Sequence, residues 1–327
     1  GEDELRVIVT TAGGGTGNIN ASGWVIQDYQ ADFDTLRFDG DGTGNTITGT
    51  SVNDIINGGA GADTLNGFSG HDVIEGGAGA DIINGGAGVD TASYANSASG
   101  ILITINSGTG SFGDASGDTL SAIENVIGSA HNDDIHGDDL ANRIEGRNGN
   151  DTLIGFGGVD VLLGGDDSDT LVAGLESSDL VAGETYDGGS GTDTLLVNTD
   201  GDEVFDYRTS VLTSLETLNF DSVSANLTAR FNAAQIIANF VSVIFPTSSG
   251  FARIADITMD AVTSLDLSGL SVTGLGSFLI TGDASSETVT GTSAADTING
   301  NSGDDIIHGG AGNDILDGGL GTGVDTV

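Results

Sequence analysis

The chain has 327 residues and carries 49 acidic residues against seven basic ones, all arginine, for a formal net charge of −42. Such a charge disfavours nucleic acid and anionic membrane surfaces as partners, and the lack of cysteine excludes disulfides and thiolate metal sites. Apolar residues form 37% of the chain and recur at fixed spacing, unlike those of a disordered polyanion.

Residues 1–38 contain strand-like runs and the only tryptophan, Trp24. We expect this N-terminal β segment to cap the first coil of the region that follows it. Further along, the longest apolar run, residues 236–245, is too short to span a bilayer. We therefore expect no membrane insertion.

A nine-residue repeat occupies residues 39–92. Five consecutive ninths from residue 48 read TGTSVNDII, NGGAGADTL, NGFSGHDVI, EGGAGADII and NGGAGVDTA. Each ninth combines turn glycines with one aspartate and, two positions later, an aliphatic residue. We call the position of this aspartate the slot; in the first array the slot residues are Asp54, Asp63, Asp72, Asp81 and Asp90.

A second array occupies residues 127–171 and a third residues 281–327, and one isolated copy lies at 188–195. Asn142 and Glu287 replace the slot aspartate in two repeats, and two extra residues precede Asp325. We expect weaker or empty sites where the pattern departs in this way. The slot aspartates of these repeats are Asp133, Asp151, Asp160, Asp169, Asp193, Asp296, Asp305 and Asp314.

Two regions interrupt the arrays. Residues 93–126 contain the strand-like run 101–105 and a Gly/Ser-rich turn, which predict a hairpin-like β excursion. Within the second region, residues 172–280, the part 195–280 is rich in strand-like runs separated by Asp, Ser, Gly and Asn, and predicts a solenoid or a sandwich. Within that region only residues 232–239 suggest a helical turn.

The repeat spacing has a chemical consequence. Glycines allow six residues to make a tight turn whose carbonyls point to one side, and the aspartate adds a hard anionic oxygen. Two turns and two short strands complete a coil of eighteen residues, so slot residues eighteen apart stack on one edge. A cation between stacked turns receives carboxylate and carbonyl oxygens, the environment that calcium prefers.

These residues resemble the RTX (repeats-in-toxin) nonapeptide, G-G-x-G-x-D-x-U-x, in which U is a large apolar residue. The resemblance implies an all-β fold, a parallel β-roll or β-solenoid with calcium-binding turns and several calcium ions, interrupted by non-RTX β segments. We expect the slot aspartates of all three arrays and of the isolated copy to be the metal ligands, and the region 172–280 to be largely calcium-free.

The same resemblance implies type I secretion from a Gram-negative bacterium. The segment DGGSGTDTLLV, followed by SLETLNF, also resembles parts of RTX-bearing surface-layer and adhesin proteins. We therefore expect an extracellular structural or adhesive protein that self-associates into a filament or layer in calcium. A calcium-bridged surface polysaccharide is a further expected partner.

Two other functions stay open from the sequence. The chain could be the RTX tail of a secreted enzyme such as a polysaccharide epimerase or lyase, or a passive secretion and folding module. Neither H-E-x-x-H nor G-x-S-x-G occurs, and the low content of basic residues and of tyrosine suits acidic sugars poorly. We therefore expect no catalytic residues in this chain.

Overall fold

The computed structural model describes residues 3–8, 17–23, 34–174, 176–198, 201–221, 225–247, 250–260, 262–319 and 325–326. The contacts divide the chain into two units, residues 1–169 and 170–327. Trp24, in the expected N-terminal cap, lies outside the described residues. Among the described residues, no helix is both long enough and apolar enough to cross a membrane.

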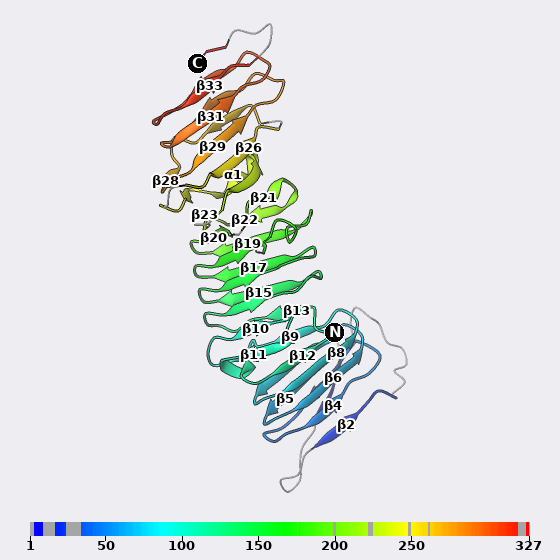
Figure 1. The fold of residues 1–327 in the computed structure, drawn as a ribbon. Helices are drawn as coiled ribbons and strands as arrows, with labels where there is room; N and C mark the ends of the chain where they lie inside the picture. The colour runs from blue at the N-terminus through cyan, green and yellow to red at the C-terminus, as the bar shows by residue number, and fades with distance from the viewer. Residues whose placement is uncertain are drawn as a thin grey trace. The chain divides into compact units, whose positions relative to one another are not determined.

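The first unit is built from two sheets whose strands stack coil upon coil (Figure 1). In spatial order, one sheet contains β1 (Asp3–Ile8), β3 (Asp34–Asp39), β5 (Asp54–Ala60), β7 (Val73–Ala78), β9 (Thr91–Ser93), β13 (Asn125–Ile127), β15 (Arg143–Asn148) and β17 (Val161–Asp166). The other contains β2 (Asn18–Asn20), β4 (Thr46–Thr48), β6 (Thr64–Ser69), β8 (Ile82–Ala87), β12 (Thr119–Ser121), β11 (Thr109–Ser111), β10 (Leu102–Thr104), β14 (Asp134–His136) and β16 (Thr152–Ile154).

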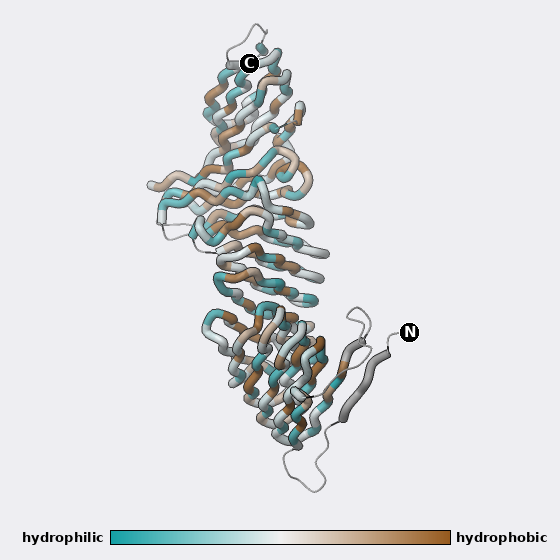
Figure 2. Tube along the Cα trace, turned by 90° about the vertical axis from the view of Figure 1, so that its right-hand side faces the viewer, coloured by the Kyte–Doolittle hydropathy of each residue, from teal (hydrophilic) through white to brown (hydrophobic). Residues whose placement is uncertain are grey.

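The nine-residue repeat explains this stacking. Each repeat supplies one turn and one short strand, and the aliphatic residue two positions after the slot points inward and is buried, as at Ile56 and Ile74. These two residues are parallel register partners in β5 and β7, so one coil takes two repeats. Figure 2 shows apolar stretches recurring from coil to coil. The structure confirms the predicted parallel β-roll.

The segment 93–126 inserts strands into the second sheet of this unit. β10 pairs antiparallel with β11, and β11 pairs antiparallel with β12, while a 3-10 turn, η1 (Gly113–Ala115), lies between β11 and β12. β12 is parallel to β8, and β10 is parallel to β14. The segment therefore widens one coil from within the sheet and returns the chain to the repeat stack.

The second unit contains four groups of parallel strands. The first two groups are β19 (Thr185–Ser190) with β22 (Val211–Thr213), and β18 (Thr170–Val172), β20 (Thr194–Val197), β23 (Thr217–Phe220), β25 (Ser242–Ile244) and β28 (Ser271–Thr273). The third is β21 (Glu203–Asp206), β24 (Leu227–Asn232), β26 (Arg253–Thr258), β29 (Ser277–Thr281), β31 (Ala295–Asn299) and β33 (Ile315–Asp317). The last is β27 (Ser264–Asp266), β30 (Thr288–Thr290) and β32 (Ile306–His308).

Coils outside the arrays are wider and have an aromatic core. Asn226 and Asp202 occupy neighbouring coils and are 24 residues apart, against 18 in the arrays. Tyr207 stacks on Phe231 with 5.2 Å between the ring centroids, and Phe220 stacks on Phe245 with 4.8 Å between them. Of the two folds open for this region, the parallel pairing decides for a solenoid, because a sandwich packs antiparallel sheets face to face.

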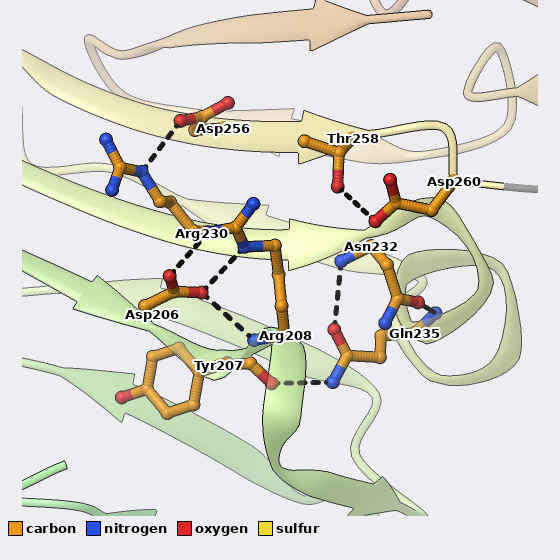
Figure 3. A network of polar contacts seen from close by, with 9 residues as sticks. All are labelled: Asp206, Tyr207, Arg208, Arg230, Asn232, Gln235, Asp256, Thr258 and Asp260. Carbon is orange, nitrogen blue, oxygen red and sulfur yellow. Dashed lines mark hydrogen bonds and ion pairs between the residues drawn. The ribbon is translucent and has the colours of Figure 1, made fainter. Parts of the chain in front are cut away.

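A short helix and a row of alternating charges mark these wider coils (Figure 3). Helix α1 (Ala233–Asn239), expected from the sequence, begins with a capping box between Asn232 and Gln235; a 3-10 turn, η2 (Tyr207–Thr209), follows β21. Asp206, Arg230 and Asp256 are register partners on adjacent strands, and the Arg230 Nε donates to Asp256 Oδ2 at 3.1 Å. Opposite charges thus alternate across three strands.

Candidate metal sites

Each slot aspartate is placed at the end of a glycine-rich turn, where the next strand begins. All of the predicted ligands are buried except Asp314, which is half-buried. Carboxylates are rarely buried without a compensating partner, because leaving water is costly for a charge. The turns therefore hold the carboxylates in an environment that demands a counter-charge.

One carboxylate oxygen of each slot residue after Asp54 in the first array contacts the preceding coil. The backbone N–H of Asp54 donates to Oδ1 of Asp72 at 2.8 Å, and that of Asp72 donates to Asp90 at 2.8 Å. On the other edge, the backbone N–H of Asp63 donates to Oδ1 of Asp81 at 2.8 Å. These contacts confirm the predicted eighteen-residue stacking, with two rows of aspartates on opposite edges.

The second and third arrays repeat this contact. The backbone N–H of Asp133 donates to Oδ1 of Asp151, and that of Asp151 to Oδ1 of Asp169, both at 2.8 Å. The backbone N–H of Asp296 donates to Oδ1 of Asp314 at 3.1 Å. The backbone N–H of Asn142 donates to Oδ1 of Asp160 at 2.9 Å, and the backbone N–H of Glu287 donates to Oδ1 of Asp305 at 2.8 Å. The isolated Asp193 contacts Glu216 instead.

The second carboxylate oxygen of seven slot residues is buried and has no hydrogen-bond partner. This holds for Oδ2 of Asp63, Asp72, Asp81, Asp90, Asp151 and Asp305, and for Oε2 of Glu287. Burial raises the pKa of three of these carboxyl groups, that of Asp63 to about 6, Asp72 to about 7 and Asp151 to about 8. Neighbouring carboxylates add to the increase in these three. The raised pKa values mean that the charged form of these carboxyl groups is disfavoured, and a cation between them would stabilise it.

Backbone carbonyls converge on the same unpaired oxygens. A Cβ added to Gly67 would lie 2.1 Å from Asp72 Oδ2 and 2.5 Å from the carbonyl oxygen of Gly85, one coil later. At Gly58 the corresponding oxygens belong to Asp63 and Gly76. Only glycine fits between these atoms, and the oxygen donors match the carboxylate-and-carbonyl sets that bind calcium. Within the described ranges, no group of three or more His, Cys, Asp or Glu gathers around one point.

Three slot aspartates differ, because a hydroxyl residue replaces the second turn glycine. Thr50 donates its N–H to Asp54 Oδ2 at 2.5 Å and its hydroxyl to Asp54 Oδ1 at 3.0 Å. The pairs Ser129–Asp133 and Thr292–Asp296 repeat these contacts. Both carboxylate oxygens are thus hydrogen bonded within their own turn. These three aspartates were expected to behave like the other slot aspartates, although a Ser or Thr four positions before the aspartate marks them in the sequence.

The structure also adds residues that the repeat register did not reveal. Asp118 accepts from the N–H of Asp81 at 2.8 Å and from the Tyr94 hydroxyl at 3.0 Å, and its pKa is raised to about 7, mainly by burial. Glu124 accepts from the N–H of Asp90 at 2.7 Å. Asp325, after the two extra residues, accepts from the N–H of Asp305 at 3.1 Å.

Asn142 places an amide where the other turns place an oxygen. Its Nδ2 donates to the backbone carbonyl of Glu124 at 2.8 Å, and its Oδ1 accepts from the N–H of Asp138 at 2.8 Å. A donor group directed at that carbonyl competes with a cation. This contact gives a physical reason for the expected weak site at Asn142.

The comparisons with known proteins agree with this geometry. The model of the RTX calcium-binding nonapeptide repeat matches four copies, at residues 39–68, 64–92, 136–171 and 290–324. No curated protein matches the chain. RTX nonapeptide repeats bind calcium, and the buried carboxylate and carbonyl oxygens of these turns suit that ion. These four segments are RTX calcium-binding nonapeptide repeats, and they form the calcium-binding parallel β-roll of this protein.

Proposed function

We propose that this protein is an extracellular structural or adhesive protein whose RTX arrays fold when they bind calcium. The proposed ligands are carboxylates of the slot residues together with backbone carbonyls of the stacked turns. The slot aspartates are Asp54, Asp63, Asp72, Asp81, Asp90, Asp133, Asp151, Asp160, Asp169, Asp193, Asp296, Asp305 and Asp314.

The row of buried carboxylate oxygens without a partner is the observation that carries this proposal. Many of the turns hold the carboxylate in place through its Oδ1 contact to the preceding coil, as Asp72 is held by the N–H of Asp54. The turn also directs a carbonyl at Oδ2, as Gly85 does at Asp72. Bound calcium would be the positively charged partner of these oxygens, which have no hydrogen-bond partner.

Folding and calcium binding should then be one equilibrium in the arrays. Without the ion, stacking the coils brings buried carboxylates together and costs free energy. With it, the affinity for calcium becomes folding free energy, because no site exists in the unfolded chain. Extracellular calcium-binding modules bind with dissociation constants of about 10⁻⁴ to 10⁻³ M. Such affinities suit a protein that stays unfolded before export and folds outside the cell.

The adhesive or assembling role rests on the composition and on the resemblance to surface-layer and adhesin segments. A net charge of −42 makes copies of the chain repel one another, and calcium would reduce this repulsion. Several large apolar side chains are exposed on the first unit, including Phe112, Ile82 and Val89. These features favour calcium-dependent association with a surface or with further copies.

A matched pair of variants tests the calcium function. Asp305 is buried in a slot, whereas its neighbour Asp304 is exposed. Asp305→Asn should weaken calcium binding, while Asp304→Asn makes the same change in charge and should leave it unchanged. Calorimetric titration with calcium chloride measures both. Equal behaviour of the two variants would count against the slot as the site, and light scattering in calcium tests the assembly.

A further inference from the structure

Two segments outside the matched repeats share a short pattern and a position. Residues 121–124 read Ser-Ala-Ile-Glu and residues 213–216 read Thr-Ser-Leu-Glu. Each segment leads into a strand, β13 and β23 respectively, that stacks one coil after a slot aspartate, Asp90 or Asp193. Their burial also agrees, since Ile123 and Leu215 are buried between exposed and half-buried neighbours.

The glutamate of each segment makes the contact that slot aspartates make inside the arrays. Glu124 Oε2 accepts from the backbone N–H of Asp90 at 2.7 Å, and Glu216 Oε2 accepts from that of Asp193 at 2.8 Å. Inside the first array the corresponding distance, from the Asp72 N–H to the Asp90 carboxylate, is 2.8 Å. The longer glutamate side chain thus reaches the same point from a turn that lacks the nonapeptide pattern.

The second residue of each segment directs its carbonyl at the preceding turn. A Cβ on Gly85 would lie 2.0 Å from the carbonyl oxygen of Ala122, and one on Gly188 would lie 2.0 Å from that of Ser214. Within the array, Gly67 faces the carbonyl of Gly85 in the same way. The two segments therefore reproduce both oxygen donors of a repeat turn.

This arrangement requires backbone strain. Ala122 has φ +49° and Ser214 has φ +52°, in the left-handed region that non-glycine residues rarely adopt. Such conformations cost about 1–3 kcal/mol each and persist where the surrounding structure fixes them, often at functional sites. Here the same strain recurs at the same position of both segments.

We propose that these two segments are site-closing turns that complete the last calcium site of a repeat row. The ligands would be the Ala122 carbonyl and the Glu124 carboxylate with Asp90, and the Ser214 carbonyl and the Glu216 carboxylate with Asp193. Oδ2 of Asp90 is fully buried and has no hydrogen-bond partner, which points to a cation at this turn. This inference rests on the proposed calcium binding of the arrays.

Replacing each glutamate by glutamine separates a ligand from a structural cap. Glu124→Gln and Glu216→Gln keep an oxygen that accepts the aspartate N–H but remove the negative charge. Calcium affinity in oxygen sites depends on the number of charged ligands. We expect each variant to lose one calcium ion from the stoichiometry, or to weaken one site by about tenfold or more. The double variant should lose two.

The experiment uses the whole chain and calcium chloride alone, with calorimetric titration and circular dichroism. Glu145→Gln is the charge-matched control, because Glu145 pairs with Arg143 at the surface of β15. Unchanged stoichiometry and affinity in the double variant would overturn the site-closing role while the wild type still binds calcium. A wild type that binds no calcium would instead overturn the function of the arrays.

Ala122→Gly tests the backbone strain of this turn. Glycine adopts φ +49° without strain, so this variant should be at least as stable in calcium as the wild type. A glycine variant that is less stable than the wild type would contradict the strained conformation assigned to Ala122.

Discussion

The backbone N–H of Asp54 donates a hydrogen bond to Oδ1 of Asp72, eighteen residues later, at 2.8 Å. The backbone N–H of Asp72 in turn donates to Oδ1 of Asp90, eighteen residues further on, at 2.8 Å. Asp72 therefore lies in the middle of a row and Asp54 begins it. Hydroxyl and amide contacts from Thr50 also satisfy both oxygens of Asp54, whereas Oδ2 of Asp72 is unpaired.

Asp72→Ala should therefore cost more calcium affinity than Asp54→Ala. The first change removes a buried carboxylate whose Oδ2 has no hydrogen-bond partner, and the second removes one whose two oxygens Thr50 already satisfies. We expect a loss of about tenfold or more for Asp72→Ala and a smaller loss for Asp54→Ala. Calorimetric calcium titration of both variants measures this. Equal, small losses would mean that the stacked rows are not the calcium sites.

Removing calcium should unfold the arrays before the wider coils. The coils around β21, β24 and β26 have aromatic packing and the Arg230–Asp256 ion pair instead of rows of slot carboxylates. With excess EDTA, amides such as that of Asp72 should lose protection from hydrogen exchange, while those of β24 and β26 keep theirs. Hydrogen exchange by mass spectrometry measures both regions together. Uniform loss of protection would contradict a calcium-independent region.

Acid should partly replace calcium. In the metal-free fold the pKa of Asp72 is raised to about 7 and that of Asp151 to about 8, chiefly by burial, against about 3.9 in an unfolded chain. The folded state then binds more protons between these values, so metal-free stability should be highest below about pH 4 and fall as pH rises through 7–8.

Circular dichroism in EDTA at pH 8 and pH 5 measures this effect, and β-structure should increase at pH 5. Asp151→Asn, which carries no charge at either pH, should show a smaller difference. In the presence of calcium the pH dependence should reverse, with more β-structure at pH 8 than at pH 5, because protons compete with the ion for the carboxylates. Identical spectra at both pH values in EDTA would argue against the raised pKa values.

Asn142→Asp should create a calcium site. The change replaces the Nδ2 donor, now bonded to the carbonyl of Glu124 at 2.8 Å, by an anionic oxygen. We expect the calcium stoichiometry to rise by one. Asn150→Asp makes the same chemical change at an exposed turn position and should leave the stoichiometry unchanged. If both variants match the wild type, the amide of Asn142 is not what weakens calcium binding at this turn.

The sequence by itself determined the β-roll, the eighteen-residue coil and the rows of slot aspartates. This was possible because each nonapeptide makes one turn and one strand from local residues, so the period along the chain becomes the period in space. Asp54, Asp72 and Asp90 stack as their numbers predict. The capped helix α1 was also readable, since the signals of a helix start lie within a few residues.

Only the tertiary structure decided how the rows continue past the arrays and which carboxylates lack a partner. Asp118 and Glu124 follow Asp81 and Asp90 by 37 and 34 residues, because an inserted hairpin widens that coil. No fixed period predicts such a spacing. Asp54 and Asp72 occupy equivalent slots, yet Thr50 hydrogen bonds both oxygens of Asp54, whereas Oδ2 of Asp72 has no partner. Only the folded turn brings the hydroxyl to the carboxylate.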